Sequence, residues 1–360
     1  MSVSASFLCC YCSQMEHSFF TFYPLVYIGD LSYVIYLFHW PIINFNKLVN
    51  FNFLTNLNIT LLVLSICLLS LPWLKSSQCL AIHTLSPSLI ESAEFNLDEK
   101  NILQNIEDLG CDVTEKETNL GILDKENVEY CRHNGTGNGT ILVIGNSVAV
   151  RAFPTIFKLF NGDYKQIRLF ARHGAAPLLN NFPLYNQATQ DMAKDLKPDL
   201  IWIIQGMNEI LFQSKRILKR YPPRKLVQLA QSEIYKFQNL GGKVYIDLPF
   251  FITDHRPAKL IARSLIYRKN FEEKLTTSFS RVQKQIGPQI KRLKSLKCSN
   301  CEFIDIQKAI SKKPNKFYLY EPETYKVLNY DGSHLSSTAY GYIAPIYKEK
   351  IEQFKKSHSR

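Results

Sequence analysis

The stretch Ile141-Leu142-Val143-Ile144-Gly145-Asn146-Ser147 decides the fold of this chain. It is a short run of aliphatic residues that ends on a Gly-x-Ser turn. A short run with continuous apolar character indicates a strand that is buried on both faces of a sheet. Residues 148–160 follow with a helical pattern. The stretch therefore predicts a buried strand that ends on a tight turn and leads into a helix.

Similar strands and helices alternate along the rest of the chain. Further apolar runs predict strands at 166–171, 199–205, 243–249 and 302–306. Helical stretches are expected at 189–196, 225–239 and 259–296, and a last one at 336–355. Alternation of strands and helices implies a parallel sheet with helices on both faces. We expect this α/β domain to span residues 140–360, with ligands binding beyond the carboxyl ends of its strands.

The N-terminal fifth of the chain is far more apolar than the rest. Residues 19–45 are overwhelmingly apolar or aromatic, and the run 59–74 contains no charge. The second run is near the lower length limit for a membrane span, and Trp73 with Lys75 suits an anchor at the membrane interface. Residues 1–77 are therefore predicted to form a membrane part with about two transmembrane helices. A buried core helix is the alternative interpretation of the second run.

A polar segment separates this membrane part from the α/β domain. Residues 78–139 are acidic and polar with only short apolar patches, so we expect a linker region there. Its end carries two acceptor sequences for N-glycosylation, Asn134-Gly-Thr and Asn138-Gly-Thr. Such sequences also arise by chance, and they support a luminal or extracellular location only together with the cysteines.

The nine cysteines do not form a zinc-like set. Cys111 and Cys131 bracket a polar segment, and Cys298 and Cys301 form a C-x-x-C pair. A redox pair is expected after a strand and at a helix start, whereas this pair precedes a predicted strand. Structural disulfides are therefore favoured, which is typical of proteins outside the cytosol. Neither a metal ion nor a cofactor is expected.

The charge of the chain does not point to nucleic acid. The formal net charge is +12, which could suit a polyanionic partner. The sequence contains no nucleic-acid motif and no Gly-rich phosphate loop. A basic surface spread over Lys-rich helices is the favoured interpretation.

The strongest chemical signal lies near the C-terminus, in Tyr330-Asp331-Gly332-Ser333-His334-Leu335. An Asp three residues before a His lies close to it through local geometry alone. A serine hydroxyl is a weak nucleophile that needs a base, and the base needs a partner that orients it. Ser147 on its strand-to-helix turn is the candidate nucleophile, His334 the base and Asp331 the residue that orients His334.

Acyl chemistry also needs donors that stabilise an oxyanion. Three candidates follow strand ends: the N–H of Ser147, the N–H of Gly174 and the side-chain amide of Asn208. Each signal has a plain alternative, because Gly-x-Ser is often only a tight turn, Asp331–His334 could be a helix cap, and Asn208 could be a turn residue. Their joint occurrence, in this order and at strand ends, favours serine ester chemistry.

In this order, the blocks Gly145-Asn146-Ser147, Gly174, Gly206-Met207-Asn208 and Asp331-Gly332-Ser333-His334 resemble those of the SGNH hydrolase family. The family is named for the residue types that match Ser147, Gly174, Asn208 and His334. The resemblance implies a three-layer α/β/α sandwich with a flavodoxin-like parallel sheet, and ester hydrolysis or acyl transfer without a metal. Two blocks depart from the family pattern, which usually has Gly-Asp-Ser in the first and Gly-x-Asn-Asp in the third. Here Asn146 and Glu209 replace the two acids.

The stretch 29–42, Gly-Asp-Leu-Ser-Tyr-Val-Ile-Tyr-Leu-Phe-His-Trp-Pro-Ile, resembles the late membrane helices of the acyltransferase-3 family. Membrane domains of that family are often fused to a C-terminal SGNH domain, in bacteria and in nematodes. Full members have many more membrane helices, so this chain is expected to be a naturally short version or an incomplete one. In either case its membrane half is not expected to carry out acyl transfer alone.

These observations lead to one main functional hypothesis and two alternatives. The main hypothesis is a membrane-anchored serine acyl esterase or O-acyltransferase of the SGNH type. It would use an acyl donor and a carbohydrate or lipid acceptor, with its soluble domain luminal or extracellular. The alternatives are a non-catalytic glycan- or acyl-binding module and an accessory subunit of a membrane acyltransferase.

Overall fold

A computed structural model of the protein describes residues 86–99, 103, 106–112, 127–206, 223–311, 313 and 315–358. The predicted membrane part and Asn208 lie outside these ranges. No helix within them is long and apolar enough to span a membrane. The chain divides into two units, and the unit of residues 91–265 and 269–360 contains the sheet and the predicted site.

The strands of the described residues are β1 (Val128–Asn134), β2 (Thr140–Gly145), β3 (Gln166–Arg172), β4 (Leu200–Ile204), β5 (Lys243–Asp247), β6 (Thr276–Ser278), β7 (Cys301–Ile304) and β8 (Lys316–Tyr318). The α-helices are α5 (Pro87–Phe95), α8 (Ser147–Phe160), α9 (Pro183–Leu196), α12 (Pro223–Leu240), α13 (Pro257–Ile266), α14 (Glu272–Leu275), α15 (Phe279–Lys294), α16 (Ile306–Ile310) and α17 (Ser337–His358). Two short 3-10 turns complete the set, η3 (Glu107–Leu109) and η5 (Pro177–Leu179).

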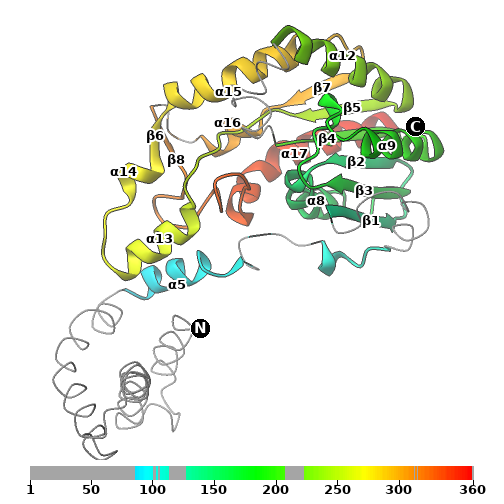
Figure 1. The fold of residues 1–360 in the computed structure, drawn as a ribbon. Coiled ribbons are helices and arrows are strands. Elements are labelled where there is room, and N and C mark those ends of the chain that lie inside the picture. The colour runs from blue at the N-terminus through cyan, green and yellow to red at the C-terminus, as the bar shows by residue number, and fades with distance from the viewer. Residues whose placement is uncertain are drawn as a thin grey trace, which may run out of the picture. The chain divides into compact units, whose positions relative to one another are not determined.

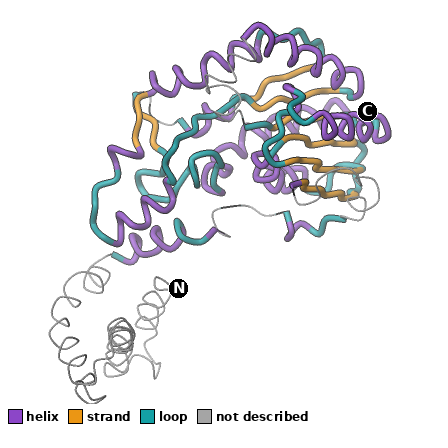
Figure 2. The backbone as a smooth tube through the Cα atoms, in the orientation of Figure 1, coloured by secondary structure: helices purple, strands orange, loops and turns teal. Residues whose placement is uncertain are grey.

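The main sheet is mostly parallel, as the alternation of elements predicts. Its strand order is β1-β3-β2-β4-β5-β7, and all neighbouring pairs are parallel except β1 with β3. The smaller sheet pairs β6 with β8 in antiparallel fashion. Figure 2 shows the strands of the main sheet side by side, with helices around them.

Helices cover both faces of the main sheet, which explains why its strands are apolar throughout. On one face, α9, α12 and α15 pack over alternate strand residues such as Leu142, Ile203 and Ile246. On the other face lie α8 and α17, where Trp202 of β4 meets Tyr347 of α17 with ring centroids 4.9 Å apart. Figure 1 shows these helices around the sheet. Residues that alternate along a strand point to opposite faces, so both must be apolar.

The stretch 259–296, expected as one helix, is interrupted. It forms the end of α13, the single turn α14, strand β6 and then α15. Asn270 accepts a hydrogen bond from the N–H of Glu272 at 2.9 Å, and Ser278 caps α15 by accepting from the N–H of Arg281 at 3.2 Å. Between Asn270 and Ser278, the β-branched pair Thr276-Thr277 joins β8. These local hydrogen bonds and the β-branched pair therefore interrupt the single charged helix that the sequence predicts for 259–296.

The stretch expected as a linker contains part of the folded unit. Strand β1 pairs with β3 along its whole length, from Val128 opposite Arg172 to Asn134 opposite Gln166. A disulfide between Cys111 and Cys131 ties β1 to the segment before it. The unit therefore begins before residue 140. An edge strand that contains Glu129, Arg132 and His133 gives a weaker sequence signal than the wholly apolar central strands.

Residues 92–96 belong to this unit as well and bond a distant segment of it. The side chain of Asn96 donates to the carbonyl of Tyr325 at 2.8 Å and accepts from the N–H of Val327 at 2.9 Å. Ser92 donates to the carbonyl of Thr324. These bonds attach the end of α5 to the segment that leads into the Asp331–His334 turn.

The prediction of structural disulfides is confirmed for two pairs. Besides Cys111–Cys131, a disulfide joins Cys298 and Cys301. The second pair closes the turn before β7, as expected for a pair that precedes a strand.

Candidate active site

The nucleophile turn lies at the carboxyl end of β2, where the backbone passes very close to β4. A Cβ atom at residue 145 would overlap the carbonyl oxygen of Ile204, so only glycine fits there. Asn146 caps α8, its side-chain oxygen accepting from the N–H of Val148 at 3.0 Å. Ser147 is the first residue of α8, which places its N–H at the positive end of the helix.

The structure brings three of the predicted site residues into a chain of hydrogen bonds. Nε2 of His334 lies 2.7 Å from Oγ of Ser147, although the two residues are 187 positions apart. Nδ1 of His334 lies 2.8 Å from Oδ2 of Asp331. Serine, histidine and aspartate are thus linked in the order that nucleophile activation requires.

The environment of Asp331 keeps its carboxyl ionised. Burial alone would raise the pKa of this carboxyl, but hydrogen bonds and the charge of His334 outweigh it and hold the pKa well below its ordinary range. Besides His334, the N–H of Ser333 donates to the carboxylate at 2.9 Å. An ionised carboxylate only accepts, so the proton between Asp331 and His334 belongs to Nδ1. When the imidazole is neutral, Nε2 is then the lone-pair nitrogen that faces the hydroxyl of Ser147.

The turn that carries Asp331 and His334 is held from two sides. Asn329, which is buried, accepts from the N–H of Gly332 at 2.7 Å and donates to its carbonyl at 3.1 Å. The N–H of Thr253 donates to the same carbonyl at 3.0 Å. Gly332 has φ +103°, and a Cβ there would overlap the carbonyl oxygens of Thr253 and His255. The loop after β5 therefore fixes the turn against the sheet.

Gly174 lies at the same edge of the sheet as Ser147. Gly145 of β2 is opposite Ala171 of β3 in a parallel pair, and each candidate residue follows its strand by a few positions. Within the described part of the chain, the N–H groups of Ser147 and Gly174 have no acceptor in the protein. Both are therefore available to a ligand, which is what donors to an oxyanion require.

The loop of Gly174 is closed by an asparagine that sequence reasoning missed. Asn181 donates to the carbonyl of Gly174 at 3.0 Å and accepts from the N–H of Ala176 at 2.7 Å. Tyr185 was missed as well, and its buried hydroxyl lies 3.2 Å from the N of Gly145 and 3.0 Å from the O of Gly145. The only local signal for Asn181 is a run of turn-forming residues before the Pro at the start of α9.

Other residues near the predicted blocks have ordinary partners or cannot be placed. Nε2 of His173 lies 3.5 Å from a carboxylate oxygen of Glu129, and His255 is exposed. Asn208 lies outside the described residues. Its role as an oxyanion donor therefore stays a prediction, as do those of Ser147 and Gly174.

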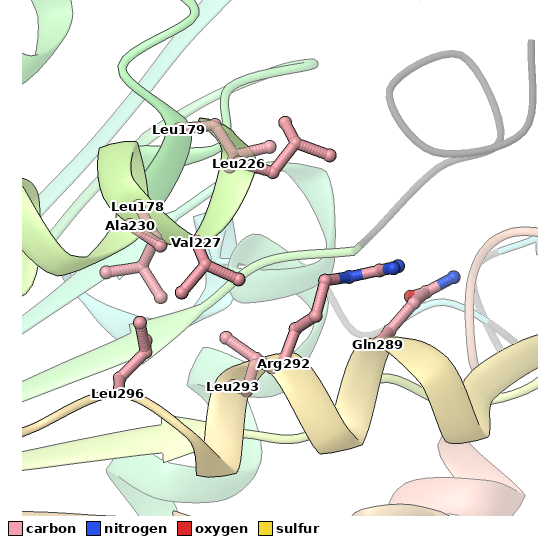
Figure 3. Close-up of a pocket in the computed structure, with 9 residues that line it drawn as sticks. All are labelled: Leu178, Leu179, Leu226, Val227, Ala230, Gln289, Arg292, Leu293 and Leu296. Carbon is pink, nitrogen blue, oxygen red and sulfur yellow. The ribbon is translucent and has the colours of Figure 1, made fainter. Parts of the chain in front are cut away.

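A separate apolar pocket lies between α12, α15 and η5 (Figure 3). Its lining is Leu178, Leu179, Leu226, Val227, Ala230, Gln289, Arg292, Leu293 and Leu296. None of Ser147, Asp331 and His334 lines it. The pocket is therefore distinct from the site that these three residues form. Within the described ranges, no group of three or more His, Cys, Asp and Glu side chains could hold a metal ion.

Comparison with known proteins places the chain in a family. The family model described as "SGNH domain (fused to AT3 domains)" matches residues 110–349, well over half of the chain. No curated protein matches the chain.

The solved structures that match this chain share little sequence with it. The periplasmic domain of the lipopolysaccharide acetyltransferase of Salmonella ser. Paratyphi A is 13% identical, with a TM-score of 0.48, covering 75% of this chain and 98% of that one. An acetylxylan esterase from Geobacillus stearothermophilus is 17% identical, with a TM-score of 0.36, covering 61% and 96%. A putative acylhydrolase from Bacteroides fragilis is 14% identical, with a TM-score of 0.36, covering 62% and 91%. On the strength of the family match, the chain belongs to the family of SGNH domains that are fused to AT3 domains.

Proposed function

We propose that the protein is a serine acyl esterase or O-acyltransferase, anchored in a membrane, that acts on acyl groups of carbohydrate or lipid acceptors. Ser147 is the nucleophile, His334 the general base and acid, and Asp331 the residue that orients His334. The observation that carries this proposal is the 2.7 Å distance between Nε2 of His334 and Oγ of Ser147. The family supports the same class of chemistry.

The reaction begins when Oγ of Ser147 attacks the acyl carbonyl and its proton passes to Nε2 of His334. The resulting oxyanion accepts hydrogen bonds from the N–H groups of Ser147 and Gly174 and from the side chain of Asn208. The tetrahedral intermediate then loses the leaving alkoxide, which takes the proton from Nε2. A water or an acceptor hydroxyl next attacks the acyl-enzyme, gives its proton to Nε2, and releases Ser147 when that proton returns.

The position of Asp331 sets the tautomer of His334 throughout this cycle. With Nδ1–H donated to the carboxylate at 2.8 Å, Nε2 stays free to accept the proton of Ser147. The same carboxylate stabilises the imidazolium that forms while the proton rests on Nε2. No cofactor takes part in these steps.

The proposal extends to architecture and location. We infer a three-layer α/β/α sandwich of the flavodoxin-like type, because β3, β2, β4, β5 and β7 take the order 2-1-3-4-5 when numbered along the chain. The domain would face the luminal or extracellular side, which the two disulfides support. Residues 1–77 would anchor it.

Turnover of a small acetyl ester by the full-length chain tests the proposed activity. Wild-type protein is compared with the Ser147→Ala variant, and we expect the variant to lose nearly all of the activity. The matched control is Ser280→Ala, which removes an exposed hydroxyl of α15 whose hydrogen-bond partner is Ser278, and which should leave the rate unchanged. Equal rates for wild type and Ser147→Ala would overturn the proposal and leave a non-catalytic binding module as the alternative.

A covalent fluorophosphonate probe gives a second readout that does not depend on the choice of substrate. Such a probe labels only an activated hydroxyl, so peptide mapping should find it on Ser147. The label should be absent from a His334→Ala variant, because the base that activates the hydroxyl is gone.

A further inference from the structure

Helix α15 carries positive charge with no acidic residue of its own to balance it. Its sequence contains five basic residues and no Asp or Glu. Four of the basic side chains are exposed, and none of the four forms an ion pair with any residue that the structure describes. We call these four residues the α15 basic face: Arg281, Lys284, Lys291 and Lys294.

The spacing of the four residues places them on one side of the helix. They are separated by three, seven and three positions, and residues at such intervals lie on the same face. At a rise of about 1.5 Å per residue, the four charges extend over about 20 Å of helix. The opposite side of the helix is buried and consists of Val282, Ile286, Gln289 and Leu293.

The neighbouring helix does not neutralise this face. Helix α12 lies beside α15 on the outside of the sheet (Figure 1). The only acidic residue in α12 is Glu233, which is buried and forms an ion pair with Lys236. A surface that carries charge of one sign attracts ligands of the opposite sign and raises their local concentration. The two helices therefore present a surface suited to a polyanion.

The first half of α15 is bonded to the loop that holds the Asp331–His334 turn. The side chain of Gln285 accepts from the N–H of Ile252 at 2.9 Å and donates to its carbonyl at 3.0 Å. The next residue, Thr253, donates its N–H to the carbonyl of Gly332 in that turn. Arg281 and Lys284 lie within about one helical turn of Gln285. One end of the α15 basic face is thus close in the bonding network to the candidate active site.

A membrane surface and an acidic polysaccharide are the two extended anions to compare. A helix that lies in a membrane interface presents apolar side chains to the lipid, whereas the apolar side of α15 is buried within the unit. Anionic phospholipids give their negative surface potential to the cytoplasmic leaflet, and the domain is proposed to face the opposite side. The proposed function also includes a carbohydrate acceptor. These points favour the polysaccharide.

We propose that the α15 basic face binds an acidic polysaccharide, whose carboxylate or sulfate groups pair with its four side chains. This inference rests on the proposed function, and it narrows the acceptor to carbohydrate chains that carry negative charge. A single exposed ion pair is worth little and is screened by salt. Binding therefore needs several contacts at once and weakens as the salt concentration rises.

The test measures binding of the full-length chain to polygalacturonate and to heparin in about 0.1 M salt. All proteins carry Ser147→Ala, so binding is measured without turnover. The α15 variant replaces the four residues of the basic face with Gln. The control variant removes the same charge from exposed lysines on other elements, and its substitutions are Lys165→Gln, Lys197→Gln, Lys308→Gln and Lys348→Gln. The two variants have equal net charge, so a difference between them reports where the charge lies.

We expect the parent to bind at least one of the two polymers, with an affinity that falls as salt is added. The α15 variant should bind that polymer at least about tenfold more weakly than the parent, and the control variant should remain within about twofold. Equal weakening in both variants, or no binding of either polymer by the parent, would overturn the inference. Equal binding of dextran, which has no charge, would contradict it as well.

Vesicles that contain phosphatidylserine test the membrane as the partner. Vesicle binding that only the α15 variant loses, without polymer binding, would assign the face to a membrane and refute the inference. Near-ultraviolet circular dichroism checks the fold of each variant. If the fourfold variant unfolds, Arg281→Gln with Lys284→Gln and Lys291→Gln with Lys294→Gln are measured as pairs, and each pair should weaken binding about threefold. Failure of the proposed function looks different, because turnover would then be absent while polymer binding is unaffected.

Discussion

Asp247 at the end of β5 is a buried carboxyl that the proposed reaction does not use. Only 3% of the residue is exposed, and its carboxylate accepts from Nε1 of Trp202 at 2.9 Å and from the hydroxyl of Tyr347. Burial raises its pKa from 3.8 to about 7, and the two hydrogen bonds offset only part of that rise. We predict that this residue makes the protein less stable as the pH rises.

The sign and the size of the effect follow from proton linkage. The folded-state pKa is above the unfolded one, so between pH 4 and 7 the folded state binds more protons than the unfolded state. Stability is therefore fully present below the unfolded pKa and is lost as the pH rises through the folded pKa. A difference of roughly 3 pKa units corresponds to about 4 kcal/mol in the free energy of unfolding, of which about 3 kcal/mol falls between pH 4.5 and 8.

Urea unfolding of wild type and Asp247→Asn at several pH values tests this prediction. Between pH 4.5 and pH 8, the free energy of unfolding of the variant should rise by about 3 kcal/mol relative to that of wild type. A hydrogen bond lost to Tyr347 would shift the variant by a constant amount and leave the pH dependence intact. Asp191→Asn is the control, because Asp191 is exposed and a hydrogen bond from Lys194 lowers its pKa. A difference between Asp247→Asn and wild type that does not change with pH would refute the reasoning.

Three further predictions concern the site, the edge strand and the location of the domain. Asp331→Asn should lower kcat for an acetyl ester by up to about 10⁴-fold with the fold intact, because the imidazole would lose its orienting acceptor; an unchanged kcat would remove Asp331 from the proposed triad. Cys131→Ser should cost about 3 kcal/mol in unfolding free energy by opening the loop to Cys111, and a variant that unfolds at the wild-type urea midpoint would contradict this. Mass mapping of protein from its native cells should find glycans on Asn134 or Asn138; unmodified asparagines at both would count against a luminal domain in a glycosylating host.

Short stretches of sequence were sufficient to predict much of the sheet and half of the candidate site. Runs such as 141–145 and 200–204 are apolar at every position because both faces of a central strand are covered, and this needs no tertiary information to recognise. The pair Asp331 and His334 is likewise local, since three residues of chain bring the two side chains together.

Longer-range features could not be recognised in the same way. Strand β1 ends in the polar residues Arg132, His133 and Asn134 and lies at an edge, so its sequence resembles that of a polar connection. The break between α13 and α15 depends on Thr276 finding a partner strand 42 residues later, in β8. The bonds from Asn146 to Gly206 and from Asn181 to Gly174 depend on backbone groups that only the folded loops place within reach.

The sequence by itself determined which residues are able to do chemistry, where the central strands run, and that an aspartate stands beside a histidine. These properties depend on composition and on separations of a few residues. The tertiary structure alone decided that His334 meets Ser147 across 187 positions and that the side-chain amide of Asn146 bonds the backbone of Gly206. The first contact forms because the loop after β5 holds the turn of His334 beside the carboxyl end of β2, and no short-range pattern in a chain records which distant segments will meet there.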